Sequence, residues 1–326
     1  MSFRKRVQYL RRIGHAYLGG GTSQLSFWHE TPEANPNASA GTLGQYYMTF
    51  REKADYAGPF DAEGIPLLDY RGVLGQQYNP IAIAQYGLGN FNLYARDGDP
   101  ERKEKFLRIA NWLVEHLELN RHGLAMWMHH FDWEYRDTLV APWYSALAQG
   151  QGISVLVRAY KETGDARYQS AADAAFTGFR RNLTEGGVTF VDPRGDLWYE
   201  EYIVHPPTHI LNGFIWATWG VYDYFLLRED AGARSSYQSA IKTLVRNLPS
   251  FDTGFWSLYE HSGTVLPMLA SGFYHRLHIV QLQILSMLTG EPIFAEFAEK
   301  WTSYTQSAWN TRRALAMKVL FKICYY

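Results

Sequence analysis

The sequence predicts an all-α dominated fold, an α/α toroid or incomplete α/α barrel of about four helical hairpins. Three observations lead to this prediction. Apolar residues recur at helical spacing, as in Phe106, Ile109, Ala110 and Leu113. A helix, a turn that contains an acid and a second helix recur four times along the chain. The recurrences are roughly sixty residues apart, which is typical of stacked helical units that share one core.

The N-terminal part of the chain differs from the rest. Residues 1–75 are expected to form an N-terminal helix and an irregular arm packed on the main domain, and residues 76–326 the toroid itself. Between residues 19 and 75 the chain is rich in Gly, Pro, Asn and Ala, and short runs such as Gln45 to Phe50 predict one or two strands. We expect this arm to cover a cleft in the toroid.

Each hairpin is predicted from its turn, because Gly ends a helix in a left-handed conformation and a following acid favours the next helix N-terminus. The four turns contain Gly98-Asp99, Gly164-Asp165, Glu229-Asp230 and Gly290-Glu291. The helices that follow them are expected at Lys105 to Glu118, Tyr168 to Phe179, Tyr237 to Asn247 and Phe294 to Tyr304. A second folded domain is not expected.

The segments between hairpins carry the residues suited to chemistry. Residues 119–142, 180–210 and 248–273 hold most of the Gly, Pro, His, Trp and acidic residues, and loops at one end of a helical toroid are where a binding site usually lies. The run Trp198-Tyr199-Glu200-Glu201-Tyr202 is the densest of them. Rings can pack on sugar faces while acids and phenols bind hydroxyls and move protons. The alternative is that these rings only pack in the core.

Composition narrows the function classes. The 326-residue chain is 47% hydrophobic and 16% aromatic, with 23 Tyr and 11 Trp, an excess that carbohydrate-binding clefts often explain. Its net charge of −1 argues against general nucleic-acid binding. The single cysteine, Cys324, leaves no internal disulfide framework, and the first 25 residues lack a continuous apolar segment, so we expect a cytoplasmic protein.

Both ends of the chain are basic and amphipathic. Phe3 to Arg12 and Leu315 to Ile323 combine Lys or Arg with apolar residues. Such ends are either ordinary terminal helices or surfaces for peripheral contact with an anionic membrane.

A set of separated motifs occurs in one order along the chain: Pro80 to Leu88, Trp143 to Gln151, Leu156 to Tyr160, Trp198 to Tyr202, Leu211 to Phe214, Tyr259, and Tyr274 to Leu282. In these motifs the sequence resembles the D-glucuronyl C5-epimerase family, specifically its C-terminal helical domain, over roughly residues 76–305. The resemblance implies an α/α barrel, a uronate-containing oligo- or polysaccharide as substrate, no cofactor, and the homodimer that the animal members form.

The resemblance also implies site residues. The family's proton-transfer positions fall on Glu201, Tyr259 and Tyr274, with Tyr202 adjacent. The expected substrate-binding residues are Tyr86, Trp143, Tyr144, Gln149, Arg158, Trp198, Tyr199, Asn212, His275, Arg276 and His278.

The sequence departs from the family pattern at three places. Family members from animals carry a β-rich insert where here only about twenty residues separate Tyr86 from Phe106. They also have an Arg where this chain has Ser262 and an Asn where it has Val280. The resemblance therefore leaves the substrate carboxylate contacts, and with them the identity of the glycan, open.

The chemistry of C5 epimerisation explains why such residues are needed. The hydrogen at C5 of a hexuronate is weakly acidic, so an enzyme must neutralise the carboxylate, place a base on that hydrogen and place a proton donor on the opposite face. Candidate cations are Arg158, His275, Arg276 and His278. This chemistry requires no metal, and neither His205 with His209 nor the run from His129 to Asp132 has a full zinc ligand set.

Three alternatives remain at this stage. A polysaccharide lyase starts with the same proton abstraction and then expels the C4 substituent. A glycoside hydrolase needs two carboxylates roughly 5 to 9.5 Å apart, for which Glu201, Asp252 and Glu260 are candidates. A glycan-binding module would use the Trp and Tyr rings as a platform without turnover.

Overall fold

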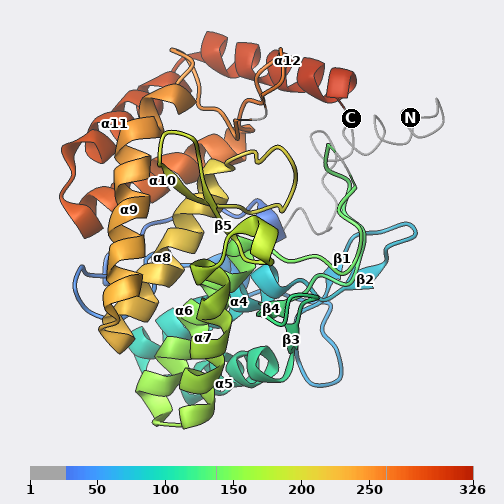
Figure 1. The fold of residues 1–326 in the computed structure, drawn as a ribbon, viewed down its shortest axis with the longest axis vertical. Coiled ribbons are helices and arrows are strands. Elements are labelled where there is room, and N and C mark those ends of the chain that lie inside the picture. The colour runs from blue at the N-terminus through green and yellow to red at the C-terminus, as the bar shows by residue number, and fades with distance from the viewer. Residues whose placement is uncertain (1–26, 137, 262, 326) are drawn as a thin grey trace.

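The computed structural model describes residues 27–136, 138–261 and 263–325 (Figure 1). The predicted basic N-terminal helix and Ser262 lie outside these residues. In the described part of the chain, long helices pair into four hairpins: α4 (Pro80–Asp97) with α5 (Pro100–Glu115), α6 (Ala146–Thr163) with α7 (Ala166–Phe176), α8 (Leu211–Arg228) with α9 (Ala231–Asn247), and α10 (Gly272–Thr289) with α11 (Pro292–Thr305). The prediction of an α/α toroid of about four hairpins is confirmed.

The turns between paired helices contain the predicted helix-ending and helix-capping residues. Gly98, Gly164 and Gly290 end α4, α6 and α10 in the left-handed conformation, with φ of 73°, 73° and 72°. The third turn uses Glu229 at φ 52° instead. In the first three turns an aspartate side chain caps the following helix: Asp99 accepts from Glu101 N, Asp165 from Arg167 N and Asp230 from Ala233 N.

The predicted bounds of the second helices needed correction. Each of these helices begins earlier than predicted, at the residue directly after the acid, because the acid itself caps it or Pro stands at its first position. Two of them also end earlier: the first ends at Glu115, after which Leu117–Leu119 forms strand β3, and the second ends at Phe176, after which Thr177–Arg180 is a 3₁₀ helix.

The inner helices α4, α6, α8 and α10 form successive packed neighbours, and α5, α7, α9 and α11 lie outside them (Figure 1). The closest approach is between α6 and α8. A Cβ on Gly150 would lie 2.7 Å from Ala217 Cα, and one on Gly220 would lie 2.3 Å from Gly150 Cα. These glycines therefore allow the two backbones to touch.

Three two-stranded antiparallel ribbons connect the helices. They are β1 (Leu68–Asp69) with β2 (Gln76–Gln77), β3 (Leu117–Leu119) with β4 (Ala125–Trp127), and β5 (Thr189–Val191) with β6 (Leu197–Tyr199). Their registers pair Leu68 with Gln77, Leu117 with Trp127 and Thr189 with Tyr199. The segment 45–50, predicted as a strand, makes one isolated bridge between Met48 and Ala34. Short 3₁₀ helices complete the connections at Thr177–Arg180, Leu183–Glu185 and Leu248–Phe251.

The arm and the last helix lie at the two ends of the helical series. The short helix α3 (Arg51–Ala54) packs on α4, and His29 contacts Phe273 of α10 with ring centroids 5.0 Å apart. The arm thus reaches both the first and the last inner helix. Helix α12 (Ala308–Tyr325) follows α11 and packs on it. None of the described helices is both long and apolar enough to cross a bilayer.

Candidate active site

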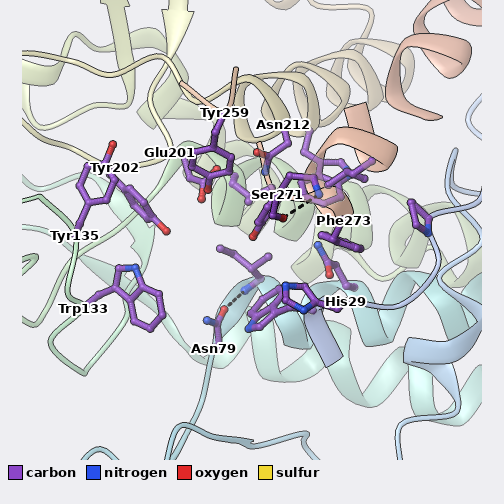
Figure 2. A pocket seen from close by; sticks show the side chains of 18 of the residues that line it. His29, Asn79, Trp133, Tyr135, Glu201, Tyr202, Asn212, Tyr259, Ser271 and Phe273 are labelled. Atoms are coloured by element: carbon purple, nitrogen blue, oxygen red, sulfur yellow. Dashed lines mark hydrogen bonds between the residues drawn. The ribbon is translucent and has the colours of Figure 1, made fainter. Parts of the chain in front are cut away.

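A cavity of about 290 Å³ lies at the N-terminal ends of the inner helices (Figure 2). Its walls come from the first turns of α4, α6, α8 and α10, from the loops 131–143 and 201–202, from the arm, and from α12. Helix N-termini carry partial positive charge, so their convergence favours a ligand with negative charge. The predicted catalytic residues Glu201, Tyr202, Tyr259 and Tyr274 all line this cavity.

Glu201 reaches the cavity because its neighbour turns the other way. The Glu200 carboxylate accepts from His209 N at 3.1 Å and contacts His209 Nδ1 at 2.5 Å. The Glu200 backbone is held from both sides, since its N–H donates to Val188 O and its carbonyl accepts from Ala146 N. Adjacent residues of an extended segment face opposite sides, so Glu201 points into the cavity.

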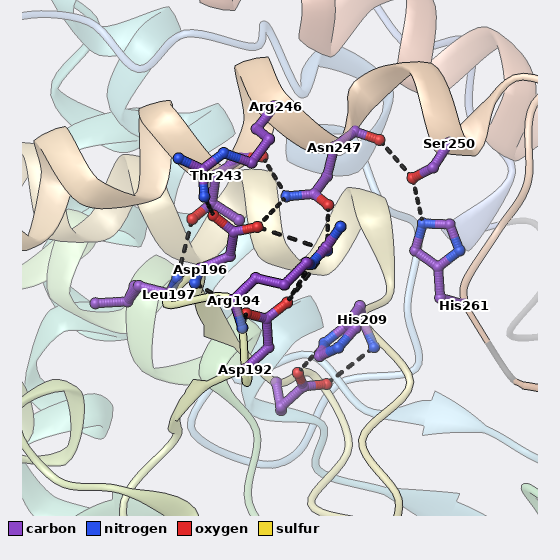
Figure 3. Close-up of polar contacts among 11 residues, drawn as sticks. Asp192, Arg194, Asp196, Leu197, His209, Thr243, Arg246, Asn247, Ser250 and His261 are labelled. Atoms are coloured by element: carbon purple, nitrogen blue, oxygen red, sulfur yellow. Dashed lines mark hydrogen bonds and ion pairs between the residues drawn. The ribbon is translucent and has the colours of Figure 1, made fainter.

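A polar network fixes the ribbon that presents these acids (Figure 3). In the β5–β6 turn, Asp196 accepts from Arg246 Nη1 at 2.6 Å and from Asn247 Nδ2 at 3.0 Å, both on α9. Leu197 N donates to Thr243 Oγ1 on the same helix at 3.0 Å. The ribbon is thereby anchored to the outer helix, which places the residues that follow β6.

Burial controls the ionisation of Glu201. The carboxyl is nearly inaccessible, and its Oε2 atom has no hydrogen-bond partner among the described residues. Burial raises the pKa of Glu201 to about 8, opposed by a hydrogen bond from Tyr202 and reinforced by the nearby charges of Glu260 and Glu200. A carboxyl with such a pKa can hold or release a proton near neutral pH.

Tyr259 and Tyr274 form a contacting pair beside it. Their ring centroids are 4.9 Å apart in an edge-to-face arrangement. Tyr259 N donates to Met268 O, and Tyr259 O accepts from Leu211 N at the start of α8. Burial, followed by the charge of Glu201, raises the pKa of the Tyr259 phenol well above its usual value, so this phenol keeps its proton. Tyr274 stands in the first turn of α10, which Ser271 caps.

Aromatic rings form another part of the wall. Tyr202 contacts Tyr135 and Trp143, with centroid distances of 4.7 and 5.8 Å. Of the predicted substrate-binding residues, Trp143 and Asn212 line the cavity, and Figure 2 shows Asn212 near Glu201 and Tyr259. The other predicted substrate-binding residues do not line it: Tyr86, Tyr144, Gln149, Arg158, Trp198, Tyr199, His275, Arg276 and His278.

Arg158 forms a buried ion pair with Asp223 and does not line the cavity. Its guanidinium donates to both carboxylate oxygens of Asp223, at 2.6 and 3.2 Å, and to Gly44 O at 2.9 Å. Both side chains are fully buried, and Tyr47 donates to the same Asp223 at 2.6 Å. Arg158 therefore ties the arm to α6 and α8.

Three more of the predicted substrate-binding residues are held by hydrogen bonds within the protein. Gln149 binds backbone atoms of Trp127, Ala125 and Ala175. His275 and His278 share the hydroxyl of Ser257, at 2.8 and 3.0 Å, within the core.

The remaining predicted substrate-binding residues have other surroundings. Trp198 stacks on His209, Tyr199 meets Phe179 edge to face, and Tyr86 contacts Phe60. Tyr144 is half-buried and Arg276 is exposed.

The carboxylates considered for hydrolysis are engaged elsewhere. Asp252 pairs with Lys300 at 2.5 Å, and Glu260 accepts a hydrogen bond from Tyr135. Neither lines the cavity with Glu201. Among the described residues, no group of three or more His, Cys, Asp or Glu could hold a metal ion.

Several lining residues were not predicted. They include His29, Lys53, Asn79, Trp133, Tyr135, Lys318 and Lys322. Lys53 is paired with Glu30 at 3.6 Å. Lys318 and Lys322 lie in the basic C-terminal segment, and their four-residue spacing on a helix was the only sequence signal that they share a face.

The family model described as D-glucuronyl C5-epimerase C-terminus matches residues 103–303, which is more than half of the chain and includes Glu201, Tyr259 and Tyr274. This chain belongs to the D-glucuronyl C5-epimerase C-terminus family. The arm and α12 lie outside the span that matches the family.

Two curated relatives extend the comparison. The D-glucuronyl C5-epimerase of Caenorhabditis elegans is 31% identical over 219 residues, covering 63% of this chain and 35% of that protein. The uncharacterized protein MJ1128 of Methanocaldococcus jannaschii is 27% identical over 265 residues, covering 74% of this chain and 84% of that protein. This member of the family thus spans about a third of the length of the nematode enzyme.

A solved structure supports the fold. The cellobiose 2-epimerase of Spirochaeta thermophila matches 93% of this chain and 86% of its own, with a TM-score of 0.50 and 14% identity. At this identity the likeness concerns the α/α architecture alone.

Proposed function

We propose that this protein is a carbohydrate epimerase that interconverts D-glucuronate and L-iduronate residues in a glycan by removing and returning the proton at C5. The observation that carries the proposal is the placement of Glu201, Tyr259 and Tyr274 on one cavity. Membership of the C5-epimerase family supports it independently.

The proposed reaction needs one group that takes the C5 proton and one that supplies a proton to the other face. Glu201 is the base in its ionised form, which its pKa of about 8 makes accessible near neutral pH. A phenol of the Tyr259–Tyr274 pair is the donor, since burial keeps Tyr259 protonated. The proton leaves C5 to Glu201, the electron pair is held by the substrate carboxylate, and the phenol reprotonates C5 with inversion. The protonated Glu201 then loses its proton to solvent and the phenolate takes one from solvent, which restores both groups.

The two carboxylates considered for hydrolysis do not support that reaction. A hydrolase requires a second carboxylate beside Glu201, and Asp252 and Glu260 are held outside the lining, where the other acids are Glu30, which is paired with Lys53, and Glu134. The aromatic wall of Trp133, Trp143 and Tyr202 suits sugar faces.

The test is to incubate the protein with uronate-containing glycans, heparosan among them, in deuterated water and to follow C5 by NMR. We expect deuterium at C5 with both glucuronate and iduronate signals. Glu201→Gln should reduce the exchange rate by at least about 10²-fold, the size of a general-base contribution. Glu299→Gln, at an exposed position of α11, is the matched control and should retain wild-type exchange.

The other outcomes are also informative. Unsaturated uronate would identify a lyase, and new reducing ends would identify a hydrolase. Binding without any exchange at C5 would contradict the proposal and favour a glycan-binding module.

A further inference from the structure

Two lysines of the C-terminal helix face the candidate active site. Lys318 and Lys322 are four residues apart on α12, so they lie on the same side of that helix, and both line the cavity with Glu201 and Tyr259. The Lys318 Nζ atom lies 5.1 Å from the centroid of the Tyr259 ring. A pair of cations is thus placed next to the residues proposed for proton transfer.

Lys318 is held in position by a hydrogen bond to the backbone. Its side chain is buried, and Nζ donates to Leu269 O at 2.7 Å. Among the described residues, no carboxylate lies within ion-pair distance of Lys318, whereas Lys53 in the same cavity is paired with Glu30 at 3.6 Å. An ammonium group has three donors, so one backbone bond leaves Lys318 able to donate to a ligand.

The two lysines place two cationic groups on one wall of the cavity. Burial and the neighbouring Lys322 lower the pKa of Lys318 to about 7, and burial lowers the pKa of Lys322 to about 8. Glu260 opposes both shifts. A ligand anion between the lysines would offset this repulsion and hold both in the charged form.

We propose that Lys318 and Lys322 bind the carboxylate of the uronate residue whose C5 faces Glu201 and Tyr259. The proposal rests on the proposed function and deepens it by naming the residues that recognise the acidic group. Two ammonium groups on that carboxylate would stabilise the negative charge that develops when the C5 proton leaves. Helix α12, which carries both lysines, lies beyond the span 103–303 that matches the family.

The experiment compares binding of methyl β-D-glucuronide with binding of methyl β-D-glucoside, which differ only in the carboxylate. Affinities are measured by NMR titration for the wild type, Lys318→Met, Lys322→Met and the control Arg312→Met, an exposed position on the same helix. We expect the wild type and Arg312→Met to prefer the glucuronide by at least about tenfold, the scale of a charge-assisted contact. Each lysine variant should lose most of that preference while binding the glucoside as before.

Several results would overturn the proposal. One is a wild type without preference for the glucuronide, whether both sugars bind equally or neither binds. Another is a preference that persists in Lys322→Met and in a folded Lys318→Met. If Lys318→Met fails to fold, the result for Lys322→Met alone tests the proposal, because Lys322 is less buried than Lys318 and its substitution disturbs the core less. C5 exchange on uronate-containing glycans, measured with the same proteins, separates the two ideas: lysine-dependent preference without exchange keeps the carboxylate site and removes the epimerase reaction.

Discussion

Glu201 lies directly against Gly213. A Cβ atom on Gly213 would come within 2.1 Å of Glu201 Oε2 and within 2.8 Å of Glu201 Cβ. Gly213 is in the first turn of α8, a helix that begins without a side-chain cap. The carboxyl therefore packs on the N-terminal backbone of this helix, and only the missing side chain leaves room for it.

The variant Gly213→Ala tests this contact. In an open helical position Ala is more favourable than Gly by about 1 kcal/mol. Here the new Cβ must displace the Glu201 carboxyl, so we expect the free energy of unfolding to fall by about 1–3 kcal/mol. The rate of C5 exchange should fall about 10²-fold, as for a misplaced catalytic group.

Gly272→Ala is the matched control for Gly213→Ala. It lies in the first turn of α10, where the nearest atom to a new Cβ is the flexible Arg276 Nη1 at 3.8 Å. Urea unfolding and the exchange assay should show this variant close to the wild type. Equal effects of the two substitutions would mean that Glu201 does not depend on the space at Gly213.

The stability of the protein should carry the pH signature of Glu201. Its pKa is raised from 4.5 to about 8 on folding, so between these values the folded state holds a proton that the unfolded state has released. The stability contributed by the neutral carboxyl is complete below pH 4.5 and is lost as the pH rises through about 8. The slope is at most about 1.4 kcal/mol per pH unit.

The measurement is urea unfolding of the wild type and of Glu201→Gln from pH 4.5 to 9. Glu260, Lys318 and Lys322 also titrate near this site, and they are present in both proteins, so the difference isolates Glu201. We expect the wild type to lose stability relative to the variant as the pH rises. A pH-independent difference would show that Glu201 ionises normally in the folded protein.

The hairpins were predictable because their signals are local. For example, Gly98 ends α4 and Asp99 caps α5. Both interactions involve only backbone groups that are close in sequence, so the local residue pattern predicts them. The ribbon β3–β4 was missed because the start of β3 continues the helical pattern of the preceding residues and β4 lies in a segment expected to be a loop. Its conformation depends on the pairing of residues such as Leu117 and Trp127.

The site was predictable only in part. Glu201, Tyr259 and Tyr274 came from the family resemblance, since no local pattern joins residues so far apart in the chain. Lys318 was beyond the reach of sequence reasoning because the way α12 covers the cavity is a tertiary contact.

Arg158 shows how a buried charge can be misjudged. From the sequence it was a candidate for the substrate, but its partner is Asp223 at 2.6 Å, on the next inner helix. We expect Arg158→Met to lower the free energy of unfolding by about 3–5 kcal/mol, because it leaves Asp223 buried without a counterion. Adding Asp223→Leu should restore part of the loss.

The control is Arg167→Met, which removes an exposed pair with Asp165 and should change stability by less than about 1 kcal/mol in urea unfolding. If Arg158→Met keeps wild-type stability but binds the glucuronide more weakly, Arg158 contacts the substrate and the structural interpretation is wrong.

The phenol pair should separate exchange from inversion. If Glu201 takes the proton from one face and Tyr259 supplies one to the other, Tyr259→Phe keeps the base and loses the donor. Glu201 can then return a solvent deuteron to the face from which it took the proton, so NMR should show deuterium in unchanged glucuronate with iduronate reduced at least about 10²-fold. Tyr199→Phe, which alters a buried phenol outside the cavity, should behave as the wild type. Inversion that survives in Tyr259→Phe but is lost in Tyr274→Phe would assign the donor to Tyr274, and loss of exchange together with inversion in Tyr259→Phe would make that phenol the base.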